Sequence, residues 1–119
     1  MASLNNDKKV QLIHIERDNT ITHYTFYSHE GKCVTEEVKL TDSWDKVRKE
    51  KETFGFVHLD AKDYDSGTPF KALILPEDID RIDVYESGHC EIEPHGGFFE
   101  LHVDLVDLPD NLKKLIVRN

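Results

Sequence analysis

The sequence predicts a mostly β fold of the β-rich α+β kind, with an antiparallel meander, one short helix and C-terminal strand repeats in a single domain. Runs rich in β-branched and aromatic residues alternate with turn-forming residues, which is typical of short strands. Apolar and polar residues alternate from Glu100 to Leu105, as in a strand with one wet face. A phrase of the form Leu-Pro-x-x-Leu/Ile-x-x-Leu/Ile-x-Val occurs at Leu75–Val84 and again at Leu108–Val117, which indicates a repeated structural unit.

The first three strands follow from hydrophobic patterning and turn chemistry. Val10–Ile15 and Ile21–Tyr27 contain mainly β-branched and aromatic residues, and residues 17–20 between them favour a turn. A second turn over residues 29–32 leads into Cys33–Leu40, whose apolar residues lie at even positions. These segments predict an antiparallel three-strand meander.

A short charged helix is predicted after the meander, over Ser43–Lys51. Thr41 or Asp42 can cap its first turn with a side-chain oxygen. Trp44 and Val47 are spaced to share one helix face, and charged residues occupy the other positions. We expect Trp44 to anchor this helix on the sheet.

The most apolar runs, Phe54–Leu59 and Phe70–Leu75, predict two central strands joined by a long polar loop over Asp60–Pro69. Glycine and proline punctuate the rest of the chain and delimit further strands. These later strands are predicted at Arg81–Tyr85, His89–Glu93, Phe98–Val106 and Leu115–Val117.

Length and charge limit the function classes. The 119 residues fit one domain over 1–119, with a flexible N-terminus over residues 1–8. The formal net charge is −9, and residues 77–119 hold 11 acidic but only 4 basic residues. A negative field repels phosphate backbones and anionic lipid, so we expect neither nucleic acid nor a membrane as partner. A protein partner with a basic patch fits better.

The two cysteines, Cys33 and Cys90, do not define a disulfide framework, and both occupy apolar strand positions where a free thiol acts as a small hydrophobe. The chain shows no secretory leader and no apolar stretch long enough to span a membrane, so the sequence predicts a cytoplasmic protein. We expect no cofactor, because no nucleotide-binding or catalytic fingerprint occurs.

The repeated phrase, together with Asn119 after Val117, resembles the core of a leucine-rich repeat. The resemblance covers Leu75–Val84 and Leu101–Asn119, about a quarter of the chain. It implies that short strands line a concave sheet, that an asparagine bonds backbone groups, and that exposed sheet positions bind protein partners. The alternative is that Leu-Pro-x-x-Leu marks two similar strand connections in a compact sheet.

A second resemblance covers the middle of the chain. Thr25-Phe26, the turn at Glu30-Gly31, the helix around Trp44 and the two central strands look like the actin-depolymerising-factor homology fold, in its coactosin-like branch. That resemblance implies an actin-binding regulator, whose actin contact lies on a long helix after the central strands. In this chain the corresponding segment is acidic and is patterned as strands.

A metal centre is the third alternative. Cys90, His95 and His102 lie close together in sequence among several glutamates, and they could serve a small metal-binding or hydrolytic enzyme. Zinc ligands usually occur as tight pairs such as Cys-x2-Cys, which this chain lacks. Neighbouring acids also oppose formation of a reactive thiolate. Surface histidines on a wet sheet face explain the pattern more simply.

The patterns therefore favour a non-catalytic protein–protein interaction module that presents an acidic β-sheet face. Strand edges also make a homodimer plausible. The predicted binding residues are the outward-facing polar residues of the last strands, Asp80, Asp83, Glu91, Glu93, Glu100, His102 and Asp104.

Overall fold

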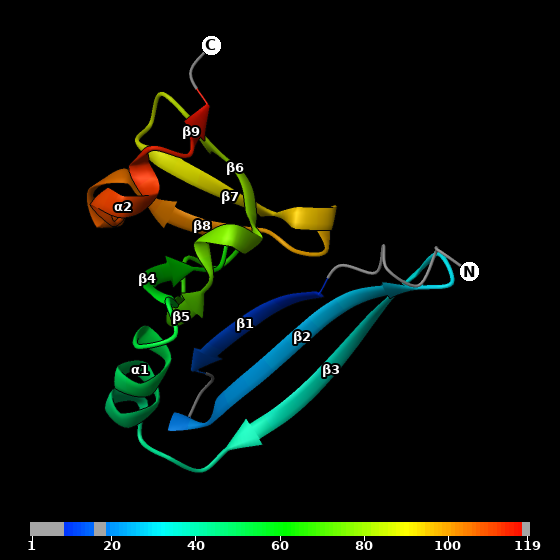
Figure 1. Ribbon diagram of the computed structural model, residues 1–119. Coiled ribbons are helices and arrows are strands. Elements are labelled where there is room, and N and C mark those ends of the chain that lie inside the picture. The colour runs from blue at the N-terminus through cyan, green and yellow to red at the C-terminus, as the bar shows by residue number, and fades with distance from the viewer. Residues whose placement is uncertain (1–8, 16–18, 118–119) are drawn as a thin grey trace.

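The computed structural model describes residues 9–15 and 19–117, and in these residues nine strands form one mostly antiparallel sheet (Figure 1). The sheet order is β3-β2-β1-β5-β4-β8-β7-β6-β9. The strands are β1 Lys9–Ile15, β2 Ile21–His29, β3 Lys32–Leu40, β4 Val57–Lys62, β5 Pro69–Ile74, β6 Ile79–Val84, β7 His89–Pro94, β8 Leu101–Asp104 and β9 Ile116–Val117. The helices are α1 Trp44–Glu52 and α2 Asp110–Lys113, with 3-10 helices at Pro76–Asp78, His95–Gly97 and Leu105–Asp107. The prediction of a mostly β fold is confirmed.

The sheet divides into two half-sheets. The N-terminal half-sheet is β3-β2-β1-β5-β4, and the C-terminal half-sheet is β8-β7-β6-β9. They are joined by one register pair, Lys62 of β4 with His102 of β8. Because the junction is so short, the two half-sheets diverge and face each other across a shared core. This core contains the buried residues Leu12, Leu59, Ala61, Ala72, Ile74, Ile79, Ile82, Cys90, Ile92, Leu101, Val103, Leu108 and Leu112.

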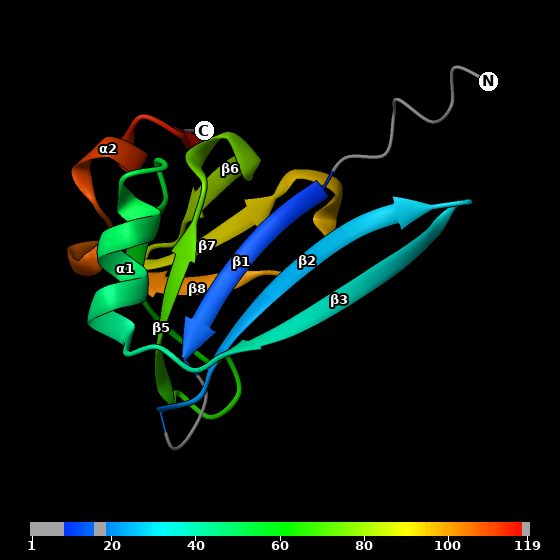
Figure 2. The ribbon, with the colours of Figure 1, turned by 60° about the horizontal axis from the view of Figure 1, so that its bottom comes forward.

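The predicted meander and its helix are confirmed. β1 pairs with β2 over its whole length, β2 pairs with β3, and Figure 2 shows the β2–β3 ribbon extending away from the body. The predicted cap, Thr41 or Asp42, is wrong, because α1 begins at Trp44 and the residue directly before it is Ser43. The Ser43 Oγ accepts the backbone N–H of Lys46 at 3.3 Å. Trp44 and Val47 pack in a second core against Ile13 and Leu73. No helix in the described part of the chain is long and apolar enough to cross a membrane.

The predicted start of the first central strand is wrong by three residues. Helical turns continue past α1, with Phe54 N–H donating to the Lys51 carbonyl at 3.0 Å, so β4 begins at Val57 instead of Phe54. The predicted long loop is also shorter, because β4 extends to Lys62. Backbone bonds between Asp63 and Thr68 then close a tight turn, which leaves residues 63–68 between the strands.

The two copies of the repeated phrase have a similar local structure, in which a short helical turn precedes a strand. The first forms the 3-10 helix Pro76–Asp78 followed by β6, and the second forms α2 followed by β9. The strands of the two copies are neighbours and run parallel, with Ile82 opposite Ile116. The expectation of a single helix is therefore wrong, because α2 forms where burial of Leu112 in the core stabilises one short turn.

Two more sequence predictions need correction. The strand predicted at Phe98–Val106 is shorter, because positive φ at Gly96 and Gly97 and the helix Leu105–Asp107 confine β8 to Leu101–Asp104. The prediction that Cys33 packs at an apolar strand position is wrong. Cys33 is exposed on β3, because the β2–β3 ribbon extends beyond the core. The predicted flexible segment over residues 1–8 and the proposed role of Asn119 lie outside the described residues.

Candidate functional site

The outer side of the C-terminal half-sheet gathers most of the predicted binding residues. Residues opposite each other on antiparallel strands share one side of a sheet. The register places Asp83 opposite Glu91, Glu91 opposite His102, and His89 opposite Asp104. We call this surface the acidic face and define it as Asp83, Glu91, Glu93, Glu100, Asp104, His89 and His102.

Two glutamates, Glu91 and Glu100, are neighbours at the centre of the acidic face. A hydrogen bond that protonated Glu100 can donate to Glu91, together with the charge of Glu91, raises the pKa of Glu100. The hydroxyl of Tyr85 donates to Oε2 of Glu91 at 2.8 Å, and this bond raises the pKa of Tyr85. Both shifts have the same physical origin, because a hydrogen bond to Glu91 favours the protonated form of each group and the charge of Glu91 opposes a further negative charge.

Lysine and arginine side chains neutralise the periphery of the acidic face but not this central pair. Arg81 bridges two acids, with Nη2 3.1 Å from Oδ2 of Asp83 and Nε 3.5 Å from Oε2 of Glu93. Lys62 lies with Nζ 2.8 Å from Oδ1 of Asp104. Among the described residues, no lysine or arginine lies within ion-pair distance of Glu91 or Glu100.

A row of four rings crosses the acidic face, in the order Tyr85, His89, His102 and Tyr64. Neighbouring ring centroids in this row are 6.0, 4.9 and 4.8 Å apart. Tyr64 is 73% exposed and Tyr85 is 49% exposed, so the row ends in two accessible phenol rings. The sequence placed His102 on a wet surface, but only 9% of it is exposed, because its neighbours on the face cover it.

The two histidines are joined by a hydrogen bond. Nε2 of His89 lies 2.8 Å from Nδ1 of His102, and the rings are within 13° of parallel. Nε2 of His102 lies 3.6 Å from Oε2 of Glu100. If His102 carries its proton on Nε2, facing that carboxylate, its Nδ1 accepts the N–H of His89. The acidic carboxylates and the ring row therefore form one connected polar network.

Sequence reasoning missed His89, Tyr64, Tyr85 and Lys62. Strand alternation could have revealed His89. It precedes Glu91 by two residues and Glu93 by four, so all three side chains lie on the same side of the strand. Lys62 and Tyr64 reach the face from β4 and its following turn, which only the tertiary pairing of β4 with β8 reveals.

Asp80 is the predicted binding residue that the structure places elsewhere. The strand register shifts between Ile79 and Arg81, so Asp80 is left out of the regular pairing of β6 with β7. Its carboxylate lies 3.6 Å from Nδ1 of His95. A bulge redirects side chains in this way, and a sequence pattern does not reveal it.

The structure does not bring Cys90, His95 and His102 together. Cys90 is fully buried in the core, His95 pairs with Asp80, and His102 pairs with His89 on the acidic face. Burial raises the pKa of the Cys90 thiol, and the charge of Asp104 adds to the effect. Within the described ranges no three such side chains form a group that could hold a metal ion.

No protein-family model, no curated protein sequence and no solved structure matches this chain. The leucine-rich-repeat and actin-depolymerising-factor resemblances therefore stay predictions. Function has to be inferred from the geometry of the acidic face and its surroundings.

Proposed function

We propose that the protein is a non-catalytic, cytoplasmic protein–protein interaction module whose acidic face binds a basic patch on a partner. The central pair Glu91 and Glu100 carries the proposal. Their carboxylates are in contact, and no lysine or arginine of the described residues pairs with either. An arginine or lysine from a partner would relieve this repulsion and gain charge-assisted hydrogen bonds.

The aromatic row supports an arginine-bearing partner in particular. Tyr64 and Tyr85 present exposed rings beside the carboxylates. A guanidinium group can stack on a phenol ring while it donates two hydrogen bonds to a carboxylate. Tyrosine and arginine are also enriched at the energetic centres of protein interfaces. The face therefore combines the anions and the rings that favour arginine over lysine.

A charge-reversal experiment tests this proposal. A fluorescent arginine-rich peptide is titrated with the protein, and anisotropy gives the affinity at several salt concentrations. The Glu91→Lys/Glu100→Lys variant is expected to bind at least about tenfold more weakly than the unchanged protein, because it replaces the central anions with cations. Salt should weaken binding to the unchanged protein, since exposed charges are screened.

The matched control is Glu37→Lys/Glu50→Lys. Both residues are exposed, they lie on β3 and α1, and the substitutions change the net charge by the same amount. We expect this control to lose less than about half of the affinity, because a distant charge acts only through the screened field. Equal losses in the two variants would show that net charge, and not the acidic face, determines binding.

A further inference from the structure

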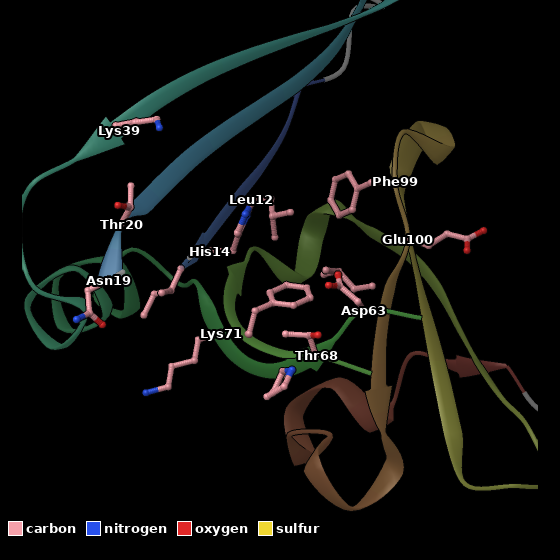
Figure 3. Close-up of a pocket in the computed structure, with 14 residues that line it drawn as sticks. Leu12, His14, Asn19, Thr20, Lys39, Asp63, Thr68, Lys71, Phe99 and Glu100 are labelled. Carbon is pink, nitrogen blue, oxygen red and sulfur yellow. The ribbon is translucent and has the colours of Figure 1, made fainter. Parts of the chain in front are cut away.

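Two neighbouring cavities form one continuous furrow beside the acidic face. The larger has a volume of about 890 Å³ and lies between β1 and β5 on one side and the chain before β8 on the other (Figure 3). The smaller has a volume of about 460 Å³ and is lined in part by Lys62, Tyr64 and His102. The cavities share four lining residues, Asp63, Phe70, Phe99 and Glu100. The furrow therefore reaches the acidic face at Glu100 and His102.

The middle of the furrow is apolar and partly exposed. Leu12 and Leu101 of the main core line it together with the partly buried rings of Phe70 and Phe99. The ring of Phe99 packs against the ring of Phe26 on β2, and the two ring centroids are 4.7 Å apart. An apolar surface of this kind gains stability when a ligand side chain covers it.

The two ends of the furrow have opposite charge. Lys39 lies at one end with Asn19, whereas Asp63 and Glu100 lie at the other end with Phe99 (Figure 3). Lys39 makes no ion pair with another described residue. A matching ligand needs a cationic group and an anionic group separated by an apolar one. Asn19, Thr20 and Thr68 add side chains that can bond the peptide groups of such a ligand.

We infer that the furrow binds an extended segment of the partner polypeptide, with a basic side chain at Asp63 and Glu100, an apolar side chain between Phe70 and Phe99, and an acidic side chain near Lys39. This inference rests on the proposed function and specifies its partner. A polypeptide fits better than a small molecule, because the furrow continues onto the acidic face, where the same partner chain can place further basic residues.

The first test uses a graded set of capped peptides in which arginine and aspartate flank one leucine at increasing separations. Anisotropy measures each affinity for the unchanged protein and for the Lys39→Glu variant. Lys39 is exposed, so the variant is expected to fold. The unchanged protein should prefer a peptide with aspartate over its lysine-substituted analogue by about five- to tenfold, and the variant should lose or invert this preference.

The matched control for charge is Lys32→Glu, which alters an exposed lysine of β3 outside the furrow and should keep the preference. A second measurement places a reporter in the apolar middle. In a Phe99→Trp variant, bound peptide should shift the indole emission to shorter wavelength, whereas the peptide without leucine should not. Trp44, the only other tryptophan, belongs to α1, is buried between this helix and the sheet, and should not respond.

The outcomes separate this inference from the proposed function. If the arginine-rich peptide binds the acidic face but the Lys39→Glu variant keeps the aspartate preference, the furrow is not the binding site and the acidic face still is. The absence of any preference among the peptides also overturns the furrow inference. If a small aromatic acid shifts the Phe99→Trp emission and the peptides do not, the furrow binds small molecules and the polypeptide assignment is wrong.

Discussion

The substitution Leu112→Ala tests whether the second copy of the repeated phrase is part of the core. Leu112 is the central residue of α2 and is fully buried among the residues between the half-sheets. Burial of a leucine side chain is worth about 1.5–3 kcal/mol, and truncation adds the cost of the cavity that remains. Leu→Ala substitutions at such sites cost about 2–5 kcal/mol. Because α2 is a single short helical turn that can relax, we expect the lower part of that range, about 2–3 kcal/mol.

Urea unfolding followed by circular dichroism measures this loss. The midpoint should fall while the dependence of the free energy on urea stays unchanged, since the same surface is exposed on unfolding. The control is Val106→Ala, a few residues earlier, because Val106 is 91% exposed and its truncation should cost less than about 0.5 kcal/mol. If Leu112→Ala costs no more than this control, then the C-terminal segment does not pack in the core, and the parallel pairing of β9 with β6 is not a stabilising part of the sheet.

Two other predictions follow from the acidic face and the cysteines. The contact with Glu91 raises the pKa of Glu100 in the folded protein, so ionised Glu100 destabilises the fold at a pH above that pKa. This penalty disappears as the pH falls below the pKa of Glu100 in the unfolded chain. Glu100→Gln should therefore raise the melting temperature at neutral pH and leave it unchanged in acid, and a lower melting temperature at neutral pH would contradict this. In the native protein a maleimide should label Cys33, which is exposed, and should not label Cys90, whose thiol is buried and has a raised pKa. Mass spectrometry of the labelled peptides measures the labelling of each cysteine. Rapid labelling of Cys90 would show that the core opens.

The sequence was sufficient where local chemistry determines local structure. The meander, the helix α1 and the short strands around Gly88 follow from strand propensity, turn residues and the spacing of Trp44 and Val47 on one helix face. The acidic face was also largely predictable, because strand alternation assigns Glu91 and Glu93 to one side whatever the neighbouring strands are. These inferences need only the period of the side chains along one strand.

Tertiary contacts determine the strand ends, the burial of His102 and the furrow. These contacts cannot be predicted from the pattern of a single sequence. The ends of β4 depend on helical turns that continue to Gly55, and the length of β8 depends on the positive φ of Gly96 and Gly97. His102 packs against the ring of Tyr64, which comes from a distant turn. The furrow likewise requires the divergence of two half-sheets that meet at one register pair. Nothing in the spacing of Phe70 and Phe99 signals that they line the same cavity.

The same register pair links the furrow to the acidic face. Lys62 and His102 are neighbours across β4 and β8, and both line the smaller cavity while also contacting the acidic network through Asp104 and His89. Glu100 belongs to both surfaces, because it lines the furrow and contacts Glu91. A cation that neutralises Glu100 from the furrow therefore removes repulsion from Glu91 on the face. Two basic residues of one partner, one in the furrow and one on the face, would then bind with coupled free energies, because each changes the field at the other's carboxylate.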